Sequence, residues 1–157
     1  MDSSGTLIDD THHLVWLRDA GLAPVVLERL AELDATLWGR SFDPRVMELI
    51  RLRFAQLLRA DGELARRTPE AIAAGLDDAT VAELAQWPTS EHFDARDRLA
   101  LAWAEQWLVD ISGITDADAA ALQDAFTERE LAQLTMAVAV FEMTTRACVA
   151  LTADAAG

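Results

Sequence analysis

This sequence is poor in the side chains that carry the commonest catalytic chemistries. Its 157 residues include one cysteine, Cys148, no tyrosine and no lysine, so that all 13 basic residues are arginine. A single cysteine excludes a disulfide within the chain and a pair of cysteine metal ligands. The absence of lysine excludes a Schiff base on a protein amine and a Walker-type phosphate-binding loop. The absence of tyrosine removes another common general acid.

Histidine is scarce as well, because the chain has only His12, His13 and His92. His12 and His13 are adjacent, so on a helix their side chains would point about 100° apart. His92 falls in a predicted loop. We therefore expect neither a metal site nor a cofactor.

The charge balance and the apolar pattern limit the partners of the chain. A net charge of −14 disfavours nucleic acid, whose phosphates require a basic surface. The apolar stretch from Thr135 to Leu151 is interrupted by Glu142 and Arg146, which argues against a membrane span. The residues after Met1 do not form a basic segment followed by an apolar core, so we expect no signal peptide and a cytoplasmic location.

Positive charge is concentrated in one segment of this acidic chain. Residues 40–67 contain seven arginines and four acids, which gives the segment a local charge of +3. Such a segment is suited to attract a carboxylate ligand. The alternative is that its arginines pair with acidic faces of neighbouring helices.

The pattern of helix caps and apolar spacings predicts an all-α fold. No alternation typical of strands persists, and the length fits one domain over residues 11–152, with flexible ends at residues 1–10 and 153–157. The first helix is expected to end near Gly21, and the fifth near Trp87. About seven to eight helices are predicted from their start signals, near Thr11, at Pro24, after Asp43, after Thr68, at Asp77 or Asp78, at Asp94, at Thr115 or Asp116, and at the capping box Thr127–Glu130.

Residues 43–53 carry a resemblance to a known family. Their sequence, Asp-Pro-Arg-Val-Met-Glu-Leu-Ile-Arg-Leu-Arg, resembles the helix that leads to the Cys-x-x-Cys-x-x-x-His redox site of the carboxymuconolactone decarboxylase and alkylhydroperoxidase D (AhpD) superfamily. Residues 33–38, 98–105 and 130–135 resemble further helices of this superfamily, so the match covers roughly residues 22–151. The resemblance implies a single-domain AhpD-like helical bundle and a homo-oligomer, commonly a trimer or a hexamer.

The same resemblance shows which reactive groups have been replaced. Carried over by position, the two cysteines of the motif correspond to Ala60 and Glu63, and the histidine corresponds to Arg67. The glutamate of the family's proton relay corresponds to Glu48. Thiol chemistry needs a thiolate nucleophile and a resolving thiol, so the family's usual peroxidase activity is expected to be absent.

The decarboxylase branch of the superfamily implies a different chemistry, which acts on an anionic lactone by proton transfer. A carboxylate can then act as the base while cations hold the substrate carboxylate. We assign Glu48 as the base, Glu63 as a second acid and Arg67 as an anion holder. That branch normally has a histidine at the position of Arg67, which puts the lactone itself in doubt. Substrate binding is assigned to three further side chains: Arg51, Trp38 and Phe54.

Each assignment has a structural alternative. Glu48 and Arg51 are three residues apart, and Glu63 and Arg67 are four apart, which are the spacings of ion pairs along a helix. If these groups only pair with one another, the chain is a catalytically inactive, oligomeric binding or scaffold member of the family. If they line a cavity, it is a cofactor-free acid–base enzyme acting on a small organic acid or lactone. A peroxidase acting through Cys148 is the third alternative, although that residue is predicted to face the core.

Overall fold

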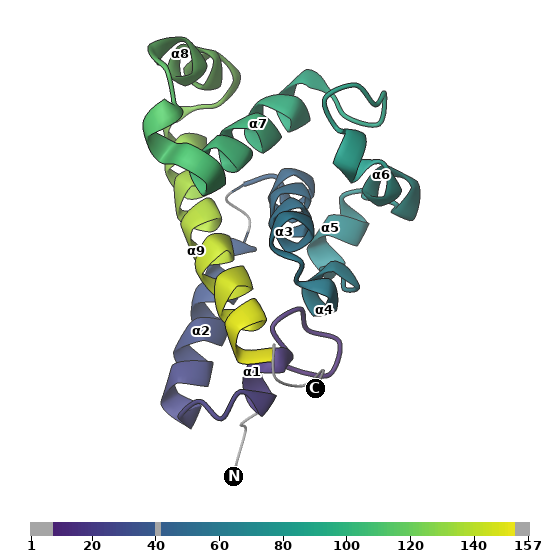
Figure 1. The fold of residues 1–157 in the computed structure, drawn as a ribbon, viewed down its shortest axis with the longest axis vertical. Coiled ribbons are helices and arrows are strands. Elements are labelled where there is room, and N and C mark those ends of the chain that lie inside the picture. Colours follow the sequence, from purple (N-terminus) through teal and green to yellow (C-terminus); the bar gives the residue numbers. More distant parts are fainter. Residues whose placement is uncertain (1–7, 40–41, 153–157) are drawn as a thin grey trace.

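The structure is a computed structural model that describes residues 8–39 and 42–152, and within these ranges the only regular elements are helices (Figure 1). The expected all-α class is therefore confirmed. The elements are α1 (Trp16–Asp19), α2 (Pro24–Leu37), α3 (Pro44–Leu58), α4 (Asp61–Leu64), α5 (Pro69–Ala73), α6 (Asp78–Ala82), α7 (Ala95–Asp110), α8 (Asp116–Ala125) and α9 (Glu128–Thr152), with 3₁₀ turns η1 (Leu84–Gln86) and η2 (Ile111–Gly113). Of the flexible ends predicted at residues 1–10 and 153–157, residues 1–7 and 153–157 lie outside the described residues.

Local capping explains why most helices begin where the sequence predicts. The Asp43 side chain accepts a hydrogen bond from the Arg45 N–H, and Pro44 occupies the first position of α3, where its missing N–H does not weaken the helix. At the start of α9, the Thr127 N–H donates to the Glu130 carboxylate over 2.8 Å, and the Glu130 N–H donates back to the threonine hydroxyl over 3.3 Å. The predicted capping box is thus formed.

The first predicted helix is wrong at its start, because α1 begins at Trp16 and not near Thr11. The Asp9 carboxylate accepts the backbone N–H groups of Thr11 and His12, and the His12 ring accepts the Leu14 N–H. These side-chain acceptors compete with helical carbonyls and hold the segment in turns. The fifth predicted helix also ends early, at Ala82, and η1 continues the chain toward Trp87.

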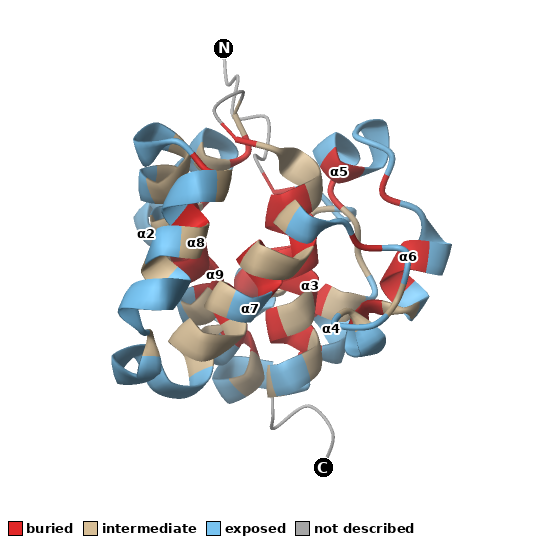
Figure 2. Ribbon diagram, turned by 90° about the horizontal axis from the view of Figure 1, so that it is seen from above, coloured by how far each residue is buried: buried red, intermediate tan, exposed pale blue. Residues whose placement is uncertain are grey.

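Helix α3 is the centre of the molecule. It packs against α9 and α7 on one side and against α4 and α5 on the other, and Figure 2 shows its buried residues between these neighbours. The main core cluster joins α3 to α7 and α9 through large apolar side chains that include Met47, Phe54, Leu134 and Phe141. Each such side chain stabilises the fold by about 1.5–3 kcal/mol when it is fully buried.

The longest helix, α9, runs beside α3 along most of the molecule (Figure 1). By length and composition alone it is apolar enough to cross a membrane, with a mean hydropathy of 1.5 in its most apolar stretch. In this fold 44% of that stretch is buried against other helices. The same apolar composition is typical of a core helix in a globular protein.

The chain turns between α3 and α4 at a residue with a left-handed backbone conformation. Arg59 has φ 60° and ψ 41°, a conformation that glycine adopts more readily. The Ala60 N–H then donates back to the Ala55 carbonyl over 2.8 Å, which closes the end of α3. This turn places α4 and residues 63–68 against the face of α3 that carries Glu48 and Arg51.

Candidate functional site

Glu48 and Arg51 form a buried ion pair on α3. The Arg51 Nε donates to Glu48 Oε2 over 2.8 Å, and Nη2 donates to Oε1 over 2.9 Å. The glutamate residue is 0% exposed and the arginine residue 1% exposed. Two parallel charge-assisted hydrogen bonds are the strongest arrangement of this pair of side chains.

The pair also holds the segment that follows α4. Arg51 Nη1 donates to the Glu63 carbonyl over 3.1 Å, and Nη2 donates to the Arg66 carbonyl over 2.7 Å. Glu48 Oε1 accepts the Thr68 N–H over 2.9 Å. The pair thus gives the buried Thr68 N–H an acceptor and adds a donor to each of two carbonyl groups between α4 and Thr68.

Both members of this pair are ionised. Burial, the largest single influence on each group, opposes its charge, but the opposite charge and the hydrogen bonds outweigh it. As a result the pKa of Glu48 lies below its ordinary value, and the pKa of Arg51 lies above its ordinary value. Glu48 is therefore a carboxylate whose charge is fixed by its partner.

Glu63 has a different environment. Its carboxyl accepts hydrogen bonds from Trp16 Nε1 over 3.1 Å and from the Thr145 hydroxyl over 3.2 Å, and its Oε2 lies 4.0 Å from Arg51 Nη1. The residue is 0% exposed. Burial dominates here and raises the pKa of Glu63. This carboxyl group links α4 to α1, α3 and α9, and it retains its proton to a higher pH than an ordinary glutamate.

Arg67 does not join this cluster. Its Nη1 donates to the carbonyls of Leu64 and Arg66, and its Nη2 lies 4.0 Å from a carboxylate oxygen of the exposed Asp78. The Glu63–Arg67 ion pair considered in the sequence analysis is not formed. The physical reason is that α4 ends at Leu64, so the helical spacing does not extend to residue 67.

Trp38 and Phe54 are buried in the main apolar core. Phe54 is 0% exposed, and the Trp38 indole N–H donates to Asp34 Oδ1 over 3.2 Å. Neither side chain faces the surface pockets described below. Among the predicted site residues, the fold thus brings together Glu48, Arg51 and Glu63, and it places the other three elsewhere.

A surface pocket lies next to this buried cluster. Its volume is about 420 Å³. It is lined by Trp16, Arg59, Ala60, Asp61, Gly62, Arg66, Cys148, Val149 and Thr152. The pocket thus contains Ala60, the position that the resemblance equates with the first cysteine of the motif, and it is walled by the C-terminal end of α9.

Cys148 lies beside Ala60, although the two are far apart in sequence. Together with Ala55 they form a small apolar cluster against Trp16. The cysteine is 3% exposed. Burial, assisted by the charge of Glu63, raises the pKa of Cys148 to about 11. This is the environment of a packed thiol and not of a thiolate nucleophile.

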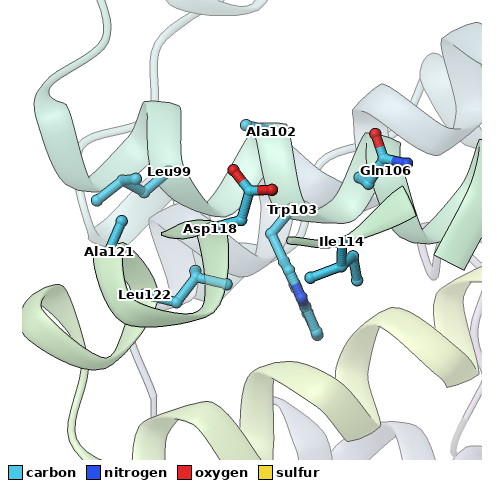
Figure 3. A pocket seen from close by; sticks show the side chains of 8 residues that line it. All are labelled: Leu99, Ala102, Trp103, Gln106, Ile114, Asp118, Ala121 and Leu122. Atoms are coloured by element: carbon cyan, nitrogen blue, oxygen red, sulfur yellow. The ribbon is translucent and has the colours of Figure 1, made fainter. Parts of the chain in front are cut away.

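A second, smaller pocket lies between α7 and α8 (Figure 3). Its volume is about 170 Å³. It is lined by Leu99, Ala102, Trp103, Gln106, Ile114, Asp118, Ala121 and Leu122. None of the predicted site residues lines it, and it offers one carboxylate and one amide among apolar side chains.

Several arginines of the positive segment pair with acids on another helix. Arg45 binds Asp97, and Arg53 binds Glu105, both on α7. For these two arginines the structural alternative of the sequence analysis is confirmed. Arg59 and Arg66 instead line the pocket beside Ala60.

The sequence analysis missed the partners of Glu63. Trp16 lies 47 residues before it and Thr145 lies 82 residues after it. Their roles arise only when α1 and α9 pack around α4. A lone tryptophan in a short helix and a threonine in an apolar helix carry no local signal for this contact.

Separate replacement of Glu48 and Arg51 is expected to be severely destabilising. Glu48→Leu or Arg51→Met leaves one buried charge without its partner, which costs about 3–5 kcal/mol of unfolding free energy. The double variant removes both charges, so its cost should fall short of the sum of the single costs by at least about 1 kcal/mol. Urea denaturation followed by circular dichroism measures the unfolding free energies of the two single variants and the double variant.

The surface pair Glu142–Arg146, whose Oε1 and Nε are 3.0 Å apart, is the matched control. Its Arg146→Met variant should change stability by no more than about 1 kcal/mol. Additive costs at Glu48 and Arg51 would show that the two buried charges do not depend on each other.

Glu63→Gln is expected to stabilise the protein increasingly as the pH rises. Because the folded-state pKa of Glu63 is raised, its contribution to stability is fully present below the unfolded-state pKa and is lost as the pH rises through the folded-state pKa. Glutamine retains an acceptor for Trp16 but carries no charge. The unfolding free energy of the variant minus that of the wild type should therefore increase as the pH rises above about 4, the ordinary pKa of a glutamate.

Glu48 should show the opposite pH dependence in the same measurement. The pKa of Glu48 is lowered, so its stabilising contribution is present above the unfolded-state pKa and is lost as the pH falls. The deficit of Glu48→Gln should accordingly shrink toward low pH. A pH-independent difference for Glu63→Gln would contradict the raised pKa.

Cys148 is expected to react slowly with a chromogenic disulfide reagent in the native protein. With a pKa of about 11, only about one thiol in 10⁴ is ionised at pH 7. The same chain in urea is the control, and it should react faster by orders of magnitude. Since no other cysteine exists, the absorbance reports this residue alone, and rapid reaction at neutral pH would restore the peroxidase alternative.

The comparisons with known proteins bear on the family. No curated protein matches the chain. Residues 24–106 match the sequence model of the Carboxymuconolactone decarboxylase family. The match runs from the start of α2 into α7, contains the buried Glu48–Arg51 pair and Glu63, and covers more than half of the 157 residues. The chain therefore belongs to the carboxymuconolactone decarboxylase family.

Proposed function

We propose that this chain is a binding member of the family, which holds a small organic acid in the pocket beside Ala60 without transforming it. The observation that carries this proposal is the closed Glu48–Arg51 pair. Oε1 of Glu48 accepts two hydrogen bonds and Oε2 accepts one, and the side chain has no solvent exposure. A general base must reach the proton that it removes, and this carboxylate reaches none outside its own network.

Arg51 is equally unsuited to hold a substrate anion. Its hydrogen bonds go to Glu48 and to the carbonyls of Glu63 and Arg66. A ligand carboxylate would have to displace several of these bonds, and the buried groups left behind would lose their partners at a cost of about 1–3 kcal/mol each.

Thiol chemistry finds no support in the composition of the pocket. The chain has one cysteine, so a thiol and a resolving thiol cannot come from the same subunit. By the resemblance, Ala60, Glu63 and Arg67 stand where the family's redox motif has its two cysteines and histidine. Of these three positions Ala60 lines the pocket, and an alanine side chain has no group that reacts.

The lining of the pocket indicates the class of ligand. Arg59 and Arg66 supply two positive charges against one negative charge from Asp61, and Trp16 and Val149 supply apolar walls. A pocket of this kind suits a carboxylate attached to an apolar body. The charge of the surrounding segment favours the same sign of ligand.

A second candidate function is acid–base catalysis with Glu63 in place of Glu48. The specific observation in its favour is that Trp16 both lines the pocket and donates to the Glu63 carboxyl. The raised pKa of Glu63 is the property that a catalytic acid requires near neutral pH.

One experiment separates the two functions. Benzoate and carboxymuconolactone are titrated into the protein by calorimetry, and the recovered ligand is analysed by mass spectrometry. The binding function predicts a complex that Arg66→Gln weakens by about tenfold or more, because one charge-assisted contact is worth about 1.5–3 kcal/mol, and it predicts unchanged ligand after incubation.

Arg29→Gln is the matched control, because Arg29 lies on the exposed side of α2 and pairs with Glu32. It should bind like the wild type. If the wild type converts the ligand and Glu63→Gln abolishes this turnover, the acid–base function would replace the binding function. Equal affinity of the Arg66 and Arg29 variants would reject the pocket as the anion site.

We also propose that the protein works as a homo-oligomer, a trimer or a hexamer. Several large apolar side chains remain exposed in the single chain, namely Val25, Val26 and Leu33 on α2 and Met136 and Met143 on α9. Exposed apolar faces of this kind are commonly covered by another subunit. Light scattering of the calorimetry samples measures the subunit number, and a monomer would refute this part of the proposal.

A further inference from the structure

The turn before α1 brings two histidines onto one carboxylate. His12 and His13 lie in the turns that precede Trp16, and Asp34 lies on α2. We propose that these three side chains form a binding site for a divalent transition-metal ion, with Zn²⁺ as the ion that the donors suit best. This site is separate from the pocket of the proposed function and does not depend on it.

The sequence analysis expected no metal site because adjacent histidines diverge on a helix. They do not lie on a helix here. Their rings stack with centroids 4.6 Å apart and an angle of 20° between the planes. Because both rings point the same way, the argument from helical geometry does not apply.

The spacing of the donor atoms fits a small coordination sphere. His13 Nε2 lies 3.0 Å from Asp34 Oδ1, and His12 Nε2 lies 3.5 Å from Oδ2. One ligand atom from each of the three residues falls within 4.8 Å of the others. In a tetrahedral zinc site with bonds of about 2.0–2.2 Å, neighbouring ligand atoms are about 3.3 Å apart. Small movements of the two rings would admit the ion.

The chemistry of the donors selects the class of ion. Two imidazoles and one carboxylate suit zinc and its transition-metal neighbours, whereas calcium and magnesium prefer oxygen ligands alone. Three protein ligands leave a fourth position for water, as in open zinc sites. Because a histidine that binds a metal does so as a neutral imidazole, the loaded cluster of Zn²⁺, two imidazoles and the Asp34 carboxylate carries one net positive charge.

Surrounding groups orient the ligands. The Trp38 indole N–H donates to Asp34 Oδ1 over 3.2 Å, and the Asp9 carboxylate accepts the His12 backbone N–H over 3.0 Å. Such supporting hydrogen bonds hold metal ligands in position. His13 and Asp34 are buried, whereas the His12 side chain is 23% exposed, so the cluster is reached from the surface at His12.

Hydrogen bonds must open when the ion binds, and the 3.0 Å contact between His13 Nε2 and Asp34 Oδ1 is replaced by bonds to the ion. His12 Nδ1 accepts the Leu14 N–H over 3.1 Å, which places the ring proton on Nε2. A metal on Nε2 requires that proton to leave and Nδ1 to carry one instead. Binding of the ion is therefore expected to break the hydrogen bond from the Leu14 N–H to His12, and the Leu14 amide resonance should report this change.

The test uses the full chain without any affinity tag and after treatment with a chelator. Zn²⁺ is titrated in competition with a chromogenic chelator, and Co²⁺ is added separately to record its visible absorption. We expect one Zn²⁺ per chain with a micromolar or tighter dissociation constant, a Co²⁺ spectrum of low coordination number, and a shifted Leu14 amide resonance. His13→Asn and Asp34→Asn should each weaken binding by at least about tenfold.

The chain provides its own controls. His92→Asn removes the remaining histidine, and Cys148→Ala removes the only thiol; both should bind Zn²⁺ like the wild type. His12→Asn changes the more exposed ligand, so it keeps the test valid if a buried variant fails to fold, as judged by circular dichroism. The proposal is overturned if the wild type binds no Zn²⁺, if the His12 variant binds as tightly as the wild type, or if a control variant loses the ion.

Discussion

The buried guanidinium of Arg51 is the group on which the centre of this fold depends. Transfer of a cation into the interior is costly, and the cost is offset only when every charge and hydrogen bond nearby has a partner. Here the partners are the Glu48 carboxylate on the same helix and two carbonyls from residues 63–66. The pair therefore closes the segment after α4 onto α3. A group that holds this closure together is poorly placed to exchange protons with a ligand.

The same guanidinium separates the behaviour of two glutamates. Glu48 accepts two hydrogen bonds from the guanidinium, whereas the Glu63 carboxyl stays 4.0 Å away from it and relies on neutral donors from Trp16 and Thr145. Equal burial thus has opposite results, with the pKa lowered at Glu48 and raised at Glu63. The charge of the first glutamate is structural. The second retains the proton affinity that acid–base chemistry uses, and it accepts a hydrogen bond from Trp16, a residue that lines the pocket.

Features encoded by neighbouring residues could be predicted, and features created by packing could not. The caps at Asp43 and Thr127 and the Glu48–Arg51 pair involve residues at most three apart, so the sequence contains both partners. The contact of Cys148 with Ala60 depends on how α9 crosses the end of α3. The prediction that His12 and His13 lie on a helix was wrong for a local reason. Asp9 stabilises turns in the segment where the apolar spacing favoured a helix. A side-chain acceptor in that position competes with helical hydrogen bonds in a way that apolar periodicity does not register.

Residues 9–16 connect the two places where we expect ligands. His12 and His13 face Asp34 at one end of this segment, and Trp16 at the other end lines the pocket and binds Glu63. An ion held by the histidines would fix the turns from which α1 begins, and with them the position of the indole. Because that indole both lines the pocket and donates to Glu63 Oε1, ordering of this short segment would act on the pocket wall and on the Glu63 hydrogen bond together.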